Sequence, residues 1–371
     1  MNILILNWRD VSHPKSGGAE HVTMEHAKGW VRAGHSVTWL TSHYDDAQHE
    51  GAREGVYFVR RAGSLTIYLY APLYLLLNAR VFDVIVDEAH GFPFFSPLVT
   101  RKPVVMFIHE IAGDIWDYMF RFPKNVVGKL LERWYFRVYK HCLFWTDAPS
   151  TVDELVERGI PRRQCTAIPC PIVRIQNLEF RIQKKEKTPT YLFVSRVVRM
   201  KGVEEVIKAF SFILRSQTNS KLWIVGAGEP AYIEELKRMM QEYGTKNHVM
   251  FFGNVSEGRK FDLMARAHLL LHASVKEGWG LVVLEAASVG TPAIVYNVPG
   301  LKDVVRNGVT GRVIKENSPR EMAKEAMLLY RNKTQYRTFQ KNCLARAKSF
   351  RWSDASKQSI QLLQRAIRYS T

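Results

Sequence analysis

The stretch HASVKEGWGLVVLEAASVG, residues 272–290, predicts a strand, a tight glycine loop and a helix that begins near Leu281. Glu277 falls in the loop, and Glu285 falls on the second helical turn, eight positions later. Two carboxylates beside exposed backbone amides suit a polyhydroxyl ligand. The structural alternative makes Glu277 a first-turn helix charge and Glu285 a buried, paired residue. The residues expected to present their N–H groups are Gly278, Trp279, Gly280 and Leu281.

The same strand-and-helix alternation extends outward from this stretch. Continuous Val/Ile/Leu runs separated by helical patterns predict parallel sheets covered by helices on both faces. The expected strands of the N-terminal half lie in NILIL (2–6), HSVTWLTS (35–42), VFDVIVDEA (81–89), KPVVMFIHE (102–110) and CLFWTDA (142–148). Those of the C-terminal half lie in TYLFVSRV (190–197), KLWIVGAG (221–228), HVMFFGNV (248–255), LLLHAS (269–274), PAIVY (292–296) and TGRVI (310–314).

The chain length predicts two domains, because 371 residues exceed the size at which one core stops growing. A charged segment flanked by prolines interrupts the alternation and is typical of a linker. We expect an α/β fold with two doubly wound, Rossmann-like domains whose ligand loops face a shared cleft. The predicted bounds are 1–170 for the first domain, 171–190 for the linker and 191–350 for the second domain.

The formal charge of +18 is concentrated in the second half of the chain. Residues 1–183 carry 21 Lys+Arg and 19 Asp+Glu, whereas the remaining residues carry 32 and 16. Such a field favours an anionic partner, which could be a nucleotide diphosphate, a phospholipid surface or nucleic acid. A basic surface without a specific partner is the alternative. No nucleic-acid-binding motif is visible, so no nucleic-acid partner is expected.

The N-terminus and the cysteines favour a cytoplasmic protein. MNILILNW has no basic region and no cleavage site, so it predicts a first strand and not a signal peptide. The longest apolar run, residues 65–77, is too short to span a bilayer and contains a proline. The four cysteines show neither metal-ligand spacing nor disulfide density.

Further segments should meet Glu277 at the strand ends of the second domain. Arg196 follows a strand, and Lys201 lies just before a helix, so the two cations predict a diphosphate site. The alternative is an exposed basic loop. Gly226 lies in an incomplete dinucleotide fingerprint, which disfavours a nicotinamide cofactor. In FFGNV, Gly253 would let the backbone approach a flat base, with Val255 beside it.

Two features of the first domain are weaker signals. Gly17 and Gly18 stand before a helix, where a loop can approach an anion or simply turn the chain. His109 ends a predicted strand, and by itself it reads as an ordinary strand-end histidine.

Together these motifs resemble the retaining glycosyltransferases of family GT4, which have the GT-B fold. The resemblance extends over nearly the whole chain. Its main element is the spacing E-x7-E with the segments EGWGL and LEAASVGTPAIV. The N-terminal segment GGAEHVTMEHAKGWVRAG also resembles the family, and so do the segments SRVVRMKG, VGAGEP, FFGNV and NGVTGRVI, which occur in the expected order. It implies a sugar transfer from a UDP- or GDP-sugar without metal or cofactor. It also implies that the C-terminal helix, residues 353–371, packs back toward the first domain.

The resemblance implies a role for each matching residue. Arg196 and Lys201 would neutralise the donor diphosphate, Glu285 would hold the ribose, and Glu277 would contact the transferred sugar. His109 would reach the donor sugar, and Gly17 and Gly18 would close on the phosphates. The catalytic residues expected are therefore Glu277, His109, Arg196 and Lys201. The chain departs from the family at IPCP, residues 168–171, where the usual sequence is Ile-Pro-Asn-Gly.

The acceptor is the least defined part of the expectation. Residues 119–141 interleave basic and aromatic side chains on a helical pattern, as interfacial helices do. This pattern, together with the apolar runs, predicts a lipid-linked or glycolipid acceptor and peripheral contact with the anionic inner face of the membrane. A soluble acceptor, an epimerase or phosphorylase, and a non-enzymatic membrane- or nucleic-acid-binding protein are the alternatives. The sequence leaves open the base, the sugar, the linkage and the oligomeric state.

Overall fold

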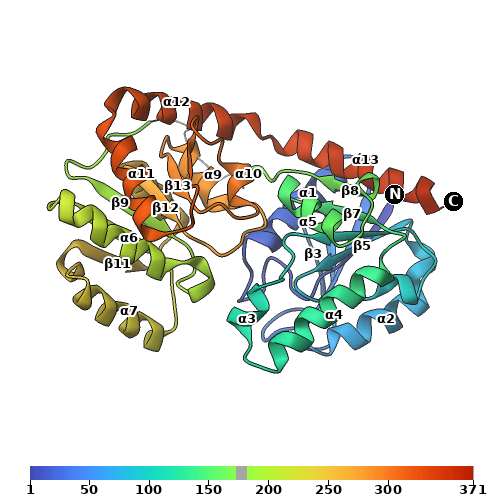
Figure 1. Cartoon of the computed structure of the whole chain (residues 1–371). Helices are drawn as coiled ribbons and strands as arrows, with labels where there is room; N and C mark the ends of the chain where they lie inside the picture. Colours follow the sequence, from blue (N-terminus) through green and yellow to red (C-terminus); the bar gives the residue numbers. More distant parts are fainter. Residues whose placement is uncertain (173–181, 371) are drawn as a thin grey trace. The chain divides into compact units, whose positions relative to one another are not determined.

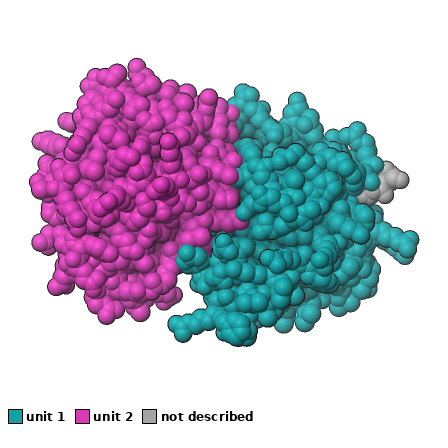
Figure 2. Space-filling view, viewed as in Figure 1, with its two compact units in different colours: residues 1–173, 351–371 teal, residues 174–350 magenta. Residues whose placement is uncertain are grey.

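The computed structural model describes residues 1–172 and 182–370, and the chain divides into two compact units (Figures 1 and 2). Unit 1 comprises Met1–Val173 and Arg351–Thr371, and unit 2 comprises Arg174–Phe350. Residues 173–181 of the predicted linker lie outside the described residues. Each unit is a sheet with helices packed on both faces, so the prediction of two parallel-sheet α/β domains is confirmed.

Unit 1 is built on an eight-stranded sheet in the order β3-β4-β2-β1-β5-β6-β7-β8. Its neighbouring strands pair in parallel, except that β3 and β4 form an antiparallel hairpin at the edge. The strand bounds are β1 Asn2–Leu6, β2 Ser36–Thr41, β3 Glu50–Arg53, β4 Val56–Arg60, β5 Val84–Ala89, β6 Val104–Ile108, β7 Leu143–Thr146 and β8 Cys165–Ala167.

The two faces of this sheet are covered by different helices. On one face α2 and α4 bury their apolar residues in a common core with β1, β5 and β6. On the other face α1 packs against α13 and the rings of β7 (Figure 1). The helix bounds are α1 Gly18–Arg32, α2 Ile67–Asn78, α3 Ile115–Met119, α4 Lys124–Val138, α5 Pro149–Glu157 and α13 Trp352–Ser370.

The C-terminal helix α13 is part of unit 1, although it follows the whole of unit 2 in the sequence. Ser359 of α13 accepts a hydrogen bond from Trp30 Nε1 of α1 at 2.8 Å. Gly29 allows the close approach, because a Cβ there would lie 2.1 Å from Ser356 Oγ. The helix therefore packs on the first domain, as the resemblance implied.

Unit 2 contains a six-stranded, fully parallel sheet in the order β11-β10-β9-β12-β13-β14. α6 and α11 pack together and contact β12, while α8 and α9 pack together and contact β9 and β13. The strands are β9 Thr190–Val194, β10 Lys221–Val225, β11 Val249–Gly253, β12 Leu269–His272, β13 Ala293–Val295 and β14 Gly311–Val313. The helices are α6 Val203–Ser216, α7 Pro230–Glu242, α8 Glu257–Arg266, α9 Leu281–Ser288, α10 Leu301–Val304, α11 Pro319–Arg331 and α12 Lys333–Ser349.

The apolar run at residues 65–77 forms α2, a helix of 12 residues that contains Pro72. Within residues 1–172 and 182–370, no helix combines the length and the hydropathy needed to cross a bilayer.

Candidate active site

The first polar centre lies in unit 2 and is built around Glu277, five residues beyond the end of β12. Glu277 Oε1 accepts a hydrogen bond from Lys201 Nζ at 2.7 Å and lies 3.0 Å from His272 Nε2. The side chains of Lys201 and Glu277 are 11% and 14% exposed. Burial alone would raise the pKa of Glu277, but Lys201 and His272 outweigh it and hold that pKa well below its ordinary value. Glu277 is therefore an ionised hydrogen-bond acceptor.

Glycines bring the loop that carries Glu277 into place. Gly280 has a left-handed backbone with φ of 82° and caps α9, which begins at Leu281 as predicted. A Cβ on Gly300 would lie 2.2 Å from the carbonyl oxygen of Glu277, so glycine is required there as well. The Trp279 side chain is buried and meets the Phe350 ring edge-on at 5.5 Å. Trp279 is buried as a whole residue and thus anchors the loop.

Glu285 forms a second carboxylate–lysine pair on the second turn of α9. Its two carboxylate oxygens lie 3.1 Å from Lys260 Nζ of α8, and both side chains are largely buried. Burial raises the pKa of Glu285, an effect that Lys260 only partly offsets. The eight-residue spacing therefore places two carboxylates in different environments, one held by Lys201 and one by Lys260.

The other predicted donor residues lie at the end of β11 or on the loops that follow β9, β10 and β11. Arg196 is exposed just beyond β9. A Cβ on Gly202 would lie 2.0 Å from Ala273 O, and a Cβ on Gly226 would lie 1.8 Å from Ser195 O. These glycines therefore let the loops after β9, β10 and β12 pack backbone against backbone. Gly253 has a positive φ and no atom within 4 Å of a Cβ position, and Val255 is half-buried.

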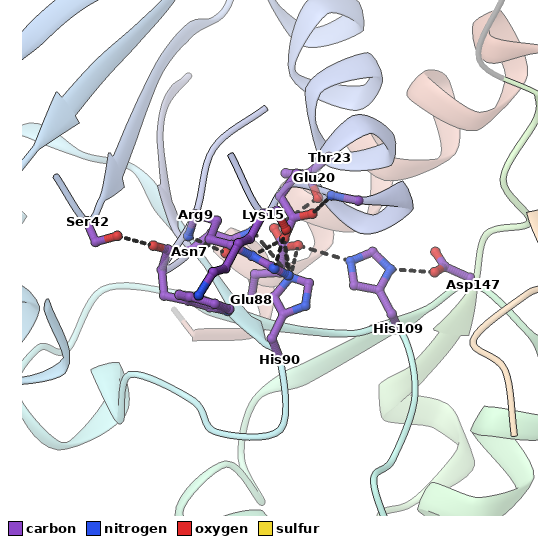
Figure 3. Close-up of polar contacts among 12 residues, drawn as sticks. Asn7, Arg9, Lys15, Glu20, Thr23, Ser42, Glu88, His90, His109 and Asp147 are labelled. Carbon is purple, nitrogen blue, oxygen red and sulfur yellow. Dashed lines mark hydrogen bonds and ion pairs between the residues drawn. The ribbon is translucent and has the colours of Figure 1, made fainter. Parts of the chain in front are cut away.

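The second polar centre lies in unit 1, at the C-terminal ends of β5, β6 and β7. Figure 3 shows His109 between two carboxylates: its Nδ1 lies 2.5 Å from Asp147 and its Nε2 lies 3.0 Å from Glu88. Burial alone would lower the pKa of His109, but Asp147 and Glu88 raise it well above its ordinary value. His109 is thus an imidazolium that donates from both ring nitrogens, and not an isolated strand-end residue.

Glu88 connects His109 to helix α1. Its Oε2 accepts from Thr23 Oγ1 of α1 at 2.9 Å, and its Oε1 lies 2.9 Å from His90 Nε2. Burial would raise the pKa of Glu88, while His109 and His90 lower it to about 2. The buried Glu20 lies 3.7 Å from His90 and binds Arg9.

Gly17 and Gly18 stand at the edge of this centre. The Gly17 N–H donates to Glu20 Oε2 at 2.6 Å, and Gly18 is the first residue of α1. The predicted glycine loop is therefore tied to a carboxylate.

Three side chains of unit 1 could together hold a metal ion. Ligand atoms of Glu88, His90 and His109 lie within 4.8 Å of one another. The hydrogen bonds described above already pair these atoms with each other, so the site is satisfied without an ion.

Sequence reasoning missed several residues of both centres. His272 and Lys260 hold the two predicted glutamates, and Glu88 and Asp147 hold His109. Glu88, Asp147 and His272 share one signal: each is a polar residue at the C-terminal end of an apolar strand.

The family of the chain is established by comparison with known proteins. The model "Glycosyltransferase Family 4" matches residues 16–173, and the model "Glycosyl transferases group 1" matches residues 174–346. An uncharacterized glycosyltransferase of Methanocaldococcus jannaschii, MJ1607, is 34% identical in an alignment of 350 positions that covers 87% of each chain. This chain belongs to the group 1 glycosyltransferases of family GT4.

Other glycosyltransferases are similar to this chain in sequence or in fold. The gpi3 subunit of phosphatidylinositol N-acetylglucosaminyltransferase from Schizosaccharomyces pombe is 24% identical over 81% of this chain and 67% of its own. Sucrose-phosphate synthase from Thermosynechococcus elongatus superposes with a TM-score of 0.77 at 18% identity over 98% of both chains. The structure of Anabaena Alr3699/HepE in complex with UDP-glucose superposes with a TM-score of 0.74 at 18% identity. The superposition covers 98% of this chain and 99% of that chain. The expected GT-B fold is confirmed, and the protein is a glycosyltransferase.

Proposed function

We propose that this glycosyltransferase moves a sugar from a UDP- or GDP-sugar to a lipid-linked saccharide or glycolipid, with retention of the anomeric configuration. The observation that carries the proposal is the pairing of both E-x7-E carboxylates with lysines, Glu277 with Lys201 and Glu285 with Lys260. Both pairs belong to segments at one edge of a parallel sheet, where open α/β folds bind nucleotides.

The donor would be held by groups of opposite charge in unit 2. Lys201 and the exposed Arg196 would neutralise the diphosphate as it leaves, together with the N–H groups at the start of α9. Glu285 would accept hydrogen bonds from the ribose. Because its pKa is strongly lowered, Glu277 would accept hydrogen bonds from the transferred sugar and could not act as a general acid near neutral pH.

His109 would supply a positive charge in unit 1, because both of its ring N–H groups are already engaged by Asp147 and Glu88. Its imidazolium is stabilised by Asp147 and Glu88, so its charge would persist at neutral pH. The proposed reaction needs no metal, since lysine, arginine and amide groups take the leaving charge. Addition of EDTA should therefore leave the rate unchanged.

The lipid-linked acceptor is favoured by the named activities of relatives. These include the gpi3 subunit above and an alpha-monoglucosyldiacylglycerol synthase of Streptococcus pneumoniae, which is 27% identical over 58% of this chain and 44% of its own. We place the reaction at the cytoplasmic face of a membrane in cell-envelope polysaccharide or lipopolysaccharide synthesis, with peripheral contact to anionic lipid.

Substitution of the lysine and of the glutamate tests the catalytic proposal. Lys201→Ala and Glu277→Ala should each lower donor hydrolysis and transfer by about 10²–10³-fold, the usual cost of losing one group that stabilises developing charge. The exposed Lys237→Ala on α7 is the matched control and should keep full activity. NMR of the product should show the anomeric configuration of the donor. Unchanged transfer by both alanine variants would rule out the proposed site.

A further inference from the structure

Helix α2 exposes an apolar face of unusual extent. It buries Ile67, Ala71 and Leu75 in the core of unit 1, and it contains no charged residue. Its opposite side carries leucines that are between 52% and 85% exposed: Leu65, Leu69, Leu73, Leu76 and Leu77, the first just before the helix. A helix on a water-facing surface normally carries polar residues there, so this face marks an interaction site.

Helix α4 repeats the arrangement. It buries Gly128, Glu132, Tyr135 and Phe136. Its other side and the preceding turn expose apolar residues at helical spacing, namely Phe122, Val126, Val127, Leu130, Leu131 and Trp134. The side of α4 that faces away from the core of unit 1 therefore carries a stripe of exposed apolar residues.

The loop between β5 and β6 joins the two faces. The Phe92 ring lies 6.0 Å from Tyr68 of α2 and 6.4 Å from Tyr135 of α4. Phe95 contacts Trp134, and Leu98 after it is 64% exposed. We call the exposed apolar residues of α2, α4, this loop and the turn before α4 the apolar platform. The same loop carries His90 of the polar centre, so the platform borders that centre.

Cations surround the platform on α4. Arg121, Lys124, Arg133 and Arg137 are exposed on or just before the helix. The acidic residues nearby are engaged elsewhere: Asp117 pairs with Lys129 at 2.5 Å, and Glu132 is buried and accepts hydrogen bonds from two backbone N–H groups at 2.8 Å. Unit 1 as a whole carries 23 Lys+Arg and 19 Asp+Glu, a net charge of only +4, so the exposed cations of this segment are a local concentration of positive charge.

We propose that the apolar platform is an interfacial membrane-binding surface that inserts its leucines and Trp134 into the headgroup region of an anionic bilayer. The basic residues of α4 would contact lipid phosphates, an arrangement typical of helices that lie in the interface. The inference rests on the proposed lipid-linked acceptor, and it adds which surface meets the membrane. A bilayer seated there would present acceptor headgroups beside the loop of His90.

Vesicle sedimentation with the full-length protein tests this surface. The wild type should sediment with vesicles of phosphatidylcholine and phosphatidylglycerol, bind less to phosphatidylcholine alone, and bind less at 0.5 M salt because exposed charges are screened. L69S/L73S and L130S/W134S should each reduce partitioning by at least about 10-fold. R133E/R137E should remove the preference for the anionic lipid. Because these side chains are exposed, the substitutions should leave the fold intact.

The matched control is M250S/L328S, which removes two residues of unit 2 that are 51% and 54% exposed, and it should bind vesicles like the wild type. Wild-type protein that stays in the supernatant, or platform variants that bind equally well, would overturn the proposal. So would a dimer that the platform variants convert to monomer without any vesicle binding. Lys201→Ala should lose thermal stabilisation by UDP or GDP yet keep vesicle binding, which separates failure of the donor proposal from failure of this one.

Discussion

At the scale of single residues, the ion pairs of the first polar centre, in unit 2, define how its charge responds to pH. Glu277 is held between Lys201 and His272, and these neighbours lower its pKa relative to the ordinary value of 4.5. The unfolded chain therefore binds a proton at this position more readily than the folded chain. By linkage, the carboxylate contributes stability that is fully present above about pH 4.5 and is lost as the pH falls through the folded pKa.

Glu277→Gln should reveal this contribution. At pH 7 the variant should lose about 1–3 kcal/mol of unfolding free energy, because the charged hydrogen bonds of Lys201 and His272 lose their anion. The difference from the wild type should shrink steadily from pH 4.5 to pH 3. Urea unfolding at several pH values measures it. A difference that stays constant across this range would contradict the lowered pKa.

The sequence predicted the principal carboxylates but not their partners. The positions of Glu277 and Glu285 follow from a local strand–loop–helix pattern, so spacing alone revealed them. Lys260 and His272 lie on other elements, and their pairing depends on how α8 and β12 meet α9. Asp147 lies 38 positions from His109, and no local pattern joins them. Such long-range ion pairs cannot be predicted from a single sequence.

At the scale of elements, the strand-and-helix alternation predicted most strands of both sheets, because buried parallel strands are continuous apolar runs. The short edge strand β8, Cys165–Ala167, was not predicted. The β3–β4 hairpin was not predicted. Its strand β3, Glu50–Arg53, is polar and mostly exposed, so it lacks the apolar signal of the others. For α2, the sequence did not predict which side of the helix is buried, because apolar residues occupy both its buried and its exposed sides.

The contact between α1 and α13 yields a prediction for packing. Gly29→Ala should destabilise unit 1 by about 1–3 kcal/mol, because the new Cβ would lie 2.1 Å from Ser356 Oγ and 2.5 Å from Ser356 Cβ. Ser356→Gly removes both of these atoms, so that the atom of residue 356 that remains near the new Cβ is its Cα, at 3.8 Å. Thermal unfolding of the single and double variants measures the coupling, and the double variant should recover most of the loss.

Gly258→Ala in α8 is the control for the helix effect. A Cβ there meets no atom within 4 Å, so this variant should be neutral or slightly more stable. Additive losses in the Gly29→Ala and Ser356→Gly double variant would show that the two helices are not in the close contact described.

At the scale of the whole molecule, unit 1 is formed by two segments of the sequence that lie on either side of unit 2. The chain completes most of unit 1, builds unit 2 and then returns to unit 1 with α13. The amphipathic pattern of residues 353–371 predicted a helix, but the pattern itself does not specify which unit the helix joins. The family resemblance supplied that assignment, and the contacts of Ser359 with Trp30 and His26 account for it physically.

Removal of α13 tests the dependence of unit 1 on the end of the chain. Truncation after Phe350 would uncover Trp30 and the rings of β7 and would discard the buried Leu362, Leu363 and Ala366. Each large apolar side chain contributes about 1.5–3 kcal/mol when buried, so the loss approaches the 5–15 kcal/mol by which a domain is stable. Hydrogen exchange should therefore show loss of protection throughout unit 1. Unit 2 has its own core and should keep its protection and its stabilisation by UDP or GDP.

Lys357→Ala, an exposed change on α13, is the control for the truncation and should leave both units protected. Full protection of β1, β5 and β6 in the truncated chain would show that α1 alone can cover that face of the sheet.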